Sequence, residues 1–174
     1  METPPSSDAR PAGTSDRAAG ATHRASEPEE SSATGDDGTP VAGDGESVFE
    51  EYVLDVRIVE FVPPDDDAHR YRFEAPHHEG ISFVDPDLAA LYADVYFDVN
   101  GFEEAGTGER GVPPVIIQAG RDTLAAYMLT QPGTDVNWVA SFYGVQNTKV
   151  ERYVSWVRER AAEIRQGAAE RGME

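Results

Sequence analysis

Hydrophobic residues near the start of the apolar part of the chain follow a strand-like pattern. Between Tyr52 and Val62, β-branched and aromatic residues alternate in part with polar residues, which is typical of a half-buried strand. Two prolines and three aspartates at 63–67 break the pattern, and residues 71–74 can return antiparallel. The pattern therefore predicts a β-hairpin, with ordered structure beginning near Ser47.

Two helices are predicted after the hairpin. The Asp-Pro pair at 85–86 is typical of a helix start, because aspartate caps the first turn and proline fits the first helical position. Apolar residues then recur at helical spacing until the Asn-Gly pair at 100–101 ends the run. Residues 115–130 also show helical spacing. Gly120 weakens this second helix by about 1 kcal/mol relative to alanine, so its first half could instead be extended.

The last third of the chain predicts a short helix, a tight turn and a long final helix. The short helix should begin at a cap at 134 or 135 and reach Phe142, and the final helix should run from about Asn147 to Gln166. The final helix carries a heptad-like apolar seam that could pair with a second subunit or fold back onto the hairpin and the helix at 86–99. We favour folding back, because alanine-rich seams give weak dimers. The seam consists of Val150, Val154, Val157, Ala161, Ile164 and Ala168.

These elements predict an α+β fold in three parts. Residues 1–46 are polar and acidic with almost no large apolar side chains, so they cannot offset the entropy cost of ordering and are expected to be a disordered leader. Residues 47–114 should form a small α+β region with the N-terminal β-hairpin plus a helix. Residues 115–170 should form a C-terminal tri-helical domain with a long last helix.

The chain is strongly acidic, and its acidity is unevenly distributed. Its 174 residues include 33 aspartates and glutamates against 14 lysines and arginines, which gives a formal net charge of −19. Residues 121–174 are neutral, with seven acidic and seven basic side chains, so the negative charge comes from residues 1–120. Lys149 is the only lysine, and cysteine is absent. This composition resembles that of proteins from extreme halophiles such as haloarchaea, in which an acidic surface maintains solubility in molar salt.

The same composition excludes several classes of protein. Without cysteine, the chain forms neither disulfides nor thiolate metal sites. Its apolar runs are shorter than the ~20 residues of a membrane span, and its N-terminus lacks the apolar core of a signal peptide. We therefore expect a soluble, cytoplasmic protein that does not contact a membrane.

Residues 136–154 carry the strongest functional signal in the sequence. Ala140 lies four positions before Gly144, and a small side chain there lets a second helix cross closely, while glycine adopts the left-handed conformation of the turn. Val145 and Val150 fall where apolar contacts would hold the two helices at a steep angle. This pattern resembles the helix-turn-helix of prokaryotic DNA-binding proteins and, with the preceding helix as support, the tri-helical core of many repressors and of sigma-type promoter-reading domains.

The resemblance implies sequence-specific binding of double-stranded DNA and hence transcriptional regulation, with the second helix in the major groove. Glutamine and asparagine can bind adenine, arginine can bind guanine, and threonine can contact a base or a thymine methyl. Lysine and arginine further along, with the backbone amides at the helix start, would contact phosphates. A homodimer through the C-terminal helix would read two half-sites. The implied DNA-binding residues are Gln146, Asn147, Thr148, Lys149, Glu151, Arg152 and Arg158, and the implied structural residues are Ala140, Gly144, Val145 and Val150.

One alternative function stays open, and enzymatic functions are disfavoured. Tri-helical units also bind proteins, so an adaptor that uses this face without contacting DNA is the alternative. Trp138 and Trp156 are expected to anchor the core or its rim rather than to stack on bases. The adjacent His77, His78 and Glu79 do not converge on one metal ion, and no phosphate-binding loop or nucleophile elbow is evident. We therefore expect no enzymatic activity, no metal and no cofactor.

Overall fold

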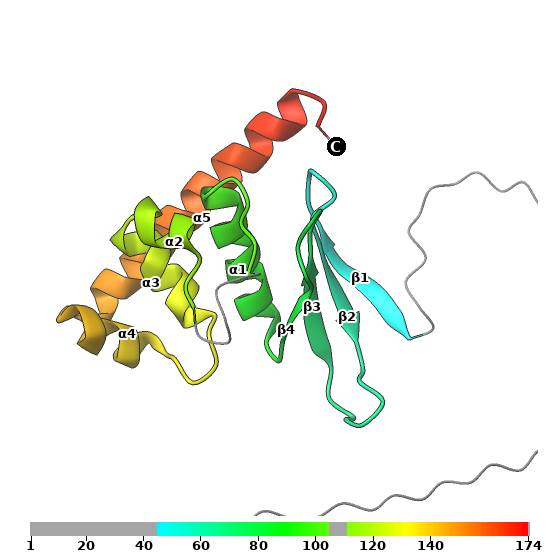
Figure 1. Ribbon diagram of the computed structural model, residues 1–174, viewed down its shortest axis with the longest axis horizontal. Coiled ribbons are helices and arrows are strands. Elements are labelled where there is room, and N and C mark those ends of the chain that lie inside the picture. Colours follow the sequence, from blue (N-terminus) through cyan, green and yellow to red (C-terminus); the bar gives the residue numbers. More distant parts are fainter. Residues whose placement is uncertain (1–44, 105–110, 174) are drawn as a thin grey trace, which may run out of the picture. The chain divides into compact units, whose positions relative to one another are not determined.

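The computed structural model describes residues 45–104 and 111–173. Within these ranges, a four-stranded antiparallel sheet is followed by five helices, the last of which is long (Figure 1). The predicted α+β class and long last helix are confirmed. The predicted leader at 1–46 lies outside the described residues, except for Gly45 and Glu46.

The sheet contains two strands more than the predicted hairpin. Its strand order is β1-β2-β3-β4, and every neighbouring pair is antiparallel. Strands β2 and β3 form the predicted hairpin, whereas β1 and β4 are not predicted. Strand β1 is acidic and mostly exposed and β4 has only three residues, so backbone pairing rather than an apolar pattern defines both. The strands are β1 (Glu46–Glu51), β2 (Arg57–Phe61), β3 (Arg70–Glu74) and β4 (Ile81–Phe83).

The strand expected at 52–62 begins later than predicted, because a turn occupies its first part. Leu54 and Asp55 have φ angles of 64° and 55°, which lie in the left-handed region and cannot belong to a strand. The turn is closed by the Tyr52 N–H, which donates to the Val56 carbonyl at 2.8 Å. The apolar residues on either side of the turn mimic strand alternation, so the sequence pattern overextends the strand.

Helix α1 (Pro86–Asp98) begins and ends where the sequence predicts. The Asp85 carboxylate accepts a hydrogen bond from the Asp87 N–H at 2.8 Å, and proline occupies the first turn. After the helix, Asn100 and Gly101 both have positive φ, at 59° and 89°. These two residues reverse the chain, as the Asn-Gly pair predicts.

The single helix predicted at 115–130 is two helices in the structure. Helix α2 (Pro114–Ala119) and helix α3 (Arg121–Leu129) are separated by Gly120, whose φ is 130° and ψ is 175°. Only glycine commonly adopts this backbone conformation. Gly120 therefore does more than weaken a continuous helix: it ends one helix and starts the next in a different direction.

Helix α4 (Val136–Tyr143) and helix α5 (Asn147–Glu170) complete the chain. Of the two predicted caps for α4, Asp135 accepts a hydrogen bond from the Trp138 N–H at 2.7 Å, whereas the Thr134 hydroxyl donates to the Met128 and Gln131 carbonyls. Helix α5 packs against α1, α3 and α4, and Val150, Val157, Ala161 and Ala168 of its seam are almost completely buried. The seam therefore folds back within the chain, although onto α1 and α3 rather than onto the hairpin.

Helix α1 forms the middle layer of residues 45–173. It contacts β3 and β4 of the sheet and also α3 and α5, so it lies between the sheet and the other helices (Figure 1). One continuous hydrophobic core extends from Ile58 and Phe73 of the sheet to Val139 of α4 and Val157 of α5. The expected 47–114 and 115–170 regions therefore share this core.

Two arginines of α5 form ion pairs with aspartates of the neighbouring helices. The Arg160 guanidinium donates to Asp98 on α1 at 2.6 and 3.0 Å and to Asp122 on α3 at 2.8 Å. The Arg165 guanidinium donates to Asp94 at 2.6 Å, and Asp94 is buried. Burial raises the Asp94 pKa above its ordinary value, although Arg165 opposes this shift. The two arginines fix the position of α5 on α1.

A polar cluster lies within the aromatic core between the sheet and the helices. The hydroxyls of Tyr92 and Tyr127 donate to Glu104 Oε1 at 2.8 and 3.1 Å, and His78 Nε2 lies 2.9 Å from the Tyr92 hydroxyl. Both tyrosines are almost completely buried. Burial, reinforced by the Glu104 carboxylate, raises the pKa of each tyrosine well above its ordinary value.

Candidate nucleic-acid interface

The turn between α4 and α5 has the local geometry that the sequence predicts. Gly144 ends α4 in the left-handed conformation, with φ 64° and ψ 38°. The Val145 N–H donates to the Ala140 carbonyl at 2.9 Å, and the Gly144 N–H donates to the Ser141 carbonyl at 3.2 Å. These two bonds form a Schellman motif, which ends a helix and redirects the chain. Helix α5 begins only three residues later, at Asn147.

The residues expected to hold the two helices together lie in the core. Ala140 is 3% exposed and Val150 is fully buried, while Val145 is half-buried and packs against the core. Helix α4 contacts both α3 and α5. The small side chain at Ala140 therefore lies inside the packed helix layer, as close packing of α4 and α5 requires.

Gly144→Ala is expected to lower the free energy of unfolding by about 1 kcal/mol, because a left-handed conformation penalises any Cβ. An added Cβ would meet no atom within 4 Å, so the loss reflects backbone conformation alone. Gly167→Ala is the matched control. Gly167 lies within α5 and has ordinary helical φ, so alanine there should leave stability unchanged or raise it. Urea unfolding of both variants tests this, and equal effects would contradict it.

The first turn of α5 presents polar side chains to solvent. Gln146, Asn147, Thr148 and Arg152 are all exposed. The Asn147 amide donates to Asn137 Oδ1 on α4 at 2.7 Å, which orients it across the turn. Gln146 caps α5 with its backbone only and makes no side-chain capping hydrogen bond to the described residues. The start of α5 therefore offers free amide groups and backbone N–H groups along its exposed end.

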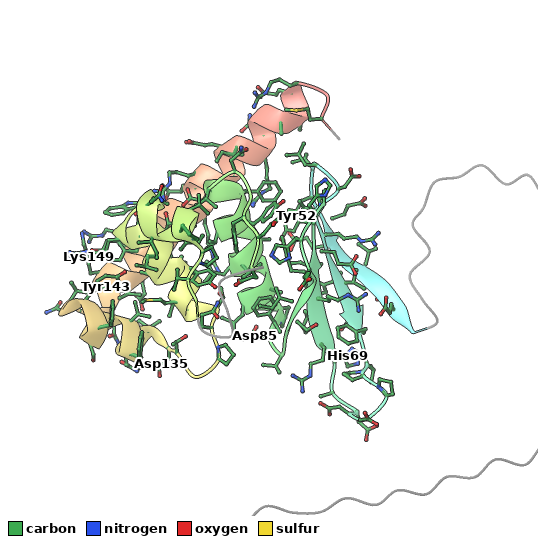
Figure 2. All side chains as sticks on the ribbon, viewed as in Figure 1. Tyr52, His69, Asp85, Asp135, Tyr143 and Lys149 are labelled. Carbon is green, nitrogen blue, oxygen red and sulfur yellow. The ribbon has the colours of Figure 1, made fainter. Side chains whose placement is uncertain are left out.

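Lys149 lies at one edge of this surface, against aromatic rings. Its ammonium is 5.2 Å from the centre of the Tyr153 ring and 5.1 Å from that of Trp156, which is cation–π distance. Figure 2 shows Lys149 at the same end of the helices as Tyr143. The sequence predicts a lysine near phosphates, and the structure adds that its resting position is over two rings.

Glu151 and Arg158 lie on the other edge of α5, apart from Lys149. Both line a groove together with residues of α1 and α4. Arg158 Nε lies 3.7 Å from Asp94 Oδ2, and the Arg158 side chain is 53% exposed. Seven residues of α5 separate Glu151 from Arg158, which places them on one face of the helix. The predicted DNA-binding residues therefore divide between two faces, and Gln146, Asn147, Thr148 and Arg152 form the central group.

Aromatic residues on α4 form a further part of this surface that the sequence reasoning did not identify. Trp138 and Phe142 are 45% and 58% exposed, and their rings stack with centroids 5.5 Å apart. Their four-residue spacing was the available signal, because it places them on one helix face. Arg121 lies over the Tyr143 ring at 5.3 Å. Burial raises the Tyr143 pKa, and the Arg121 charge opposes this shift.

Comparison with known proteins finds no matching family model, no matching curated protein and no matching solved structure. Within residues 45–104 and 111–173, no group of three or more histidine, aspartate or glutamate side chains is placed to hold a metal ion. In the same ranges, no helix has the length and apolar character needed to cross a membrane. The argument for function therefore rests on the geometry of α4 and α5.

Proposed function

We propose that this protein binds double-stranded DNA sequence-specifically and regulates transcription, with the start of α5 in the major groove. The observation that supports this proposal is the left-handed turn at Gly144, after which α5 begins with an exposed polar end. In helix-turn-helix proteins, the N-terminal residues of the second helix contact base edges while the first helix crosses the backbone. Helix α4, packed across α5, has the corresponding position in the chain.

The side chains at the start of α5 have the chemistry for reading bases. Gln146 and Asn147 carry amides that can pair with adenine, and Arg152, one turn further on, can bind guanine with two hydrogen bonds. The unpaired backbone N–H groups of the first turn favour a phosphate, because the helix dipole adds to their hydrogen bonds. Lys149 can leave its aromatic neighbours for a phosphate at small cost, because cation–π contacts at exposed sites are worth only about 0.5–1 kcal/mol.

The acidity of the chain is compatible with this proposal in molar salt. At 1 M ionic strength the Debye length is only about 3 Å, so repulsion between the acidic surface and DNA is screened. The release of counterions, which normally drives much of DNA binding, is then also weak. Binding would depend on direct base contacts, and residues 121–174 carry no net charge to oppose it.

Selection of random DNA duplexes by the full chain in molar KCl is expected to enrich one motif. Arg152→Ala should reduce discrimination at one base pair by about 1–3 kcal/mol, because one bidentate base contact is lost. Arg158→Ala is the matched control, since Arg158 lies on the other face and should leave the base preference unchanged. Failure to enrich any motif, or equal effects of the two substitutions, would reject the DNA-binding proposal.

A homodimer would extend recognition to two half-sites in the cytoplasm, where a prokaryotic regulator meets the chromosome. The seam that suggested dimerisation is covered by α1 and α3, so a dimer would need another surface. The stacked Trp138 and Phe142 on α4 are an exposed apolar surface of the kind that partners cover.

The same two aromatic residues favour the second candidate function, a protein-interaction adaptor without DNA contact. Exposed aromatic residues are enriched at the centres of protein interfaces. The two functions separate in the selection experiment. Trp138→Ala with Phe142→Ala should leave duplex selection intact if α5 binds DNA, whereas an adaptor selects no duplex with or without these substitutions.

A further inference from the structure

A groove of about 440 Å³ lies between α1, the connection from α3 to α4, and α5. Its volume is within the range of small-molecule sites in proteins. Its walls are mainly aliphatic, and its polar side chains are gathered on α5 and at the start of α4 (Figure 2 labels Asp135 there). The apolar lining consists of Leu88, Leu91, Leu129, Val136 and Val154.

Only some of the polar groups in the groove are available to a ligand. Asp135 caps α4, and the Thr134 hydroxyl donates to carbonyls of the preceding turn. Glu151, by contrast, has no hydrogen-bond or ion-pair partner among the residues that the structure describes, and it is exposed. One acidic side chain on α5 can therefore accept hydrogen bonds from a bound cation.

Arg158 is the available cation of the groove. Its guanidinium lies 3.7 Å from Asp94, whereas Arg165 donates to the same carboxylate at 2.6 Å. If Arg158 moves towards a ligand, Asp94 keeps its closer partner and no buried charge is left unpaired. A guanidinium of this kind binds a carboxylate through two parallel hydrogen bonds.

From this charge pair above an aliphatic surface, we propose that the groove binds a small apolar zwitterion, such as a free amino acid with a branched aliphatic side chain. Arg158 binds the carboxylate, Glu151 binds the ammonium, and the aliphatic side chain contacts Leu88, Leu129 and Val136. Glu151 and Arg158 are separated by about 10.5 Å along the axis of α5, and both side chains are long enough to reach a head group between them. Ser155, between them on the same face, also lines the groove.

The proposal distinguishes three probes that share the same aliphatic body. L-Leucine carries both charges, 4-methylpentanoate lacks the ammonium, and 3-methylbutylamine lacks the carboxylate. Titration of the full chain with L-leucine should give saturable NMR shifts of the methyl groups of Leu88, Leu129 and Val136. The other two probes should bind about tenfold more weakly or worse, because each loses one set of charge-assisted hydrogen bonds.

Two charge-neutralising variants assign the two contacts. Glu151→Gln should weaken leucine binding about tenfold and leave 4-methylpentanoate binding undiminished. Arg158→Gln should weaken both and leave the amine undiminished. Arg152→Gln and Glu159→Gln are matched controls with the same seven-residue spacing on the exposed face of α5, and they should bind leucine normally.

Three results would overturn the proposal: no saturable shift with leucine, equal affinity for leucine and 4-methylpentanoate, or normal leucine binding by both groove variants. Glu151 and Arg158 are exposed, so their substitution should preserve the fold, and unchanged thermal unfolding verifies this. None of these measurements involves DNA, so the ligand site can fail or succeed independently of the proposed function.

Discussion

Replacing Arg160 by methionine is expected to lower the free energy of unfolding by about 3 kcal/mol, because the substitution leaves a buried carboxylate unpaired. The Asp98 side chain is only 3% exposed, and Arg160 supplies its two guanidinium hydrogen bonds. After the substitution, the Thr123 hydroxyl at 2.7 Å would be the remaining printed partner of Asp98, and Asp122 would also lose its cation. Methionine keeps most of the apolar stem, so the loss reports mainly on charge.

Guanidinium chloride unfolding measures this loss, and two further variants give it meaning. Arg158→Met on the same helix should change stability by less than about 1 kcal/mol, because its ion pair is exposed. Asp98→Asn combined with Arg160→Met should recover part of the loss, since the unpaired charge is removed with its partner. Equal effects of Arg158→Met and Arg160→Met would show that Arg160 does not join the three helices in the way described.

Stability is expected to fall steeply above about pH 10, where tyrosines of the unfolded chain ionise. Tyr92 and Tyr127 are buried beside Glu104, and their pKa values in the folded protein are raised above that range. An acid whose folded pKa is raised stabilises the fold below its unfolded pKa and loses this contribution as pH rises towards the folded pKa. Each tyrosine should therefore lower stability by about 1.4 kcal/mol per pH unit in this window.

Urea unfolding at a series of alkaline pH values measures the slope directly. Tyr127→Phe should reduce it by about 1.4 kcal/mol per pH unit, because one of the two linked ionisations is removed. Tyrosinate absorbance should rise together with the loss of helical circular dichroism. If the absorbance of all tyrosines rises while the helices remain intact, the two buried hydroxyls are accessible to base and the explanation is wrong.

The sequence predicted the elements whose ends depend on local chemistry. An aspartate cap and a proline specify the start of α1, and the left-handed glycine at 144 specifies the end of α4; both are confirmed. Strands β1 and β4 could not be predicted in this way, because their positions depend on pairing with β2 and β3. Gly120 shows the same limit in a helix, since a propensity cost does not say where a broken helix will turn.

The candidate site was predictable in its centre and less so at its edges. Register alone placed Gln146, Asn147 and Arg152 on an exposed surface, because these positions follow from the turn at Gly144. It could not assign Arg158, whose surroundings are set by Asp94 on a distant helix, nor the groove that α1 completes. Those features require the packing of α5 on α1, which no short motif encodes.

The length of α5 has a mechanical consequence. Its 24 residues form one uninterrupted helix, held on α1 by Arg160 and Arg165, with the candidate base-reading residues at its free end. Arg160 and Gln146 are separated by about 21 Å along the axis. If the helix tilts as a stiff rod about its attachment to α1, a change of about 5° displaces Gln146 by about 2 Å, more than a base contact tolerates. The helix is thus a lever, in which small adjustments among α1, the groove and α5 are amplified at the far end.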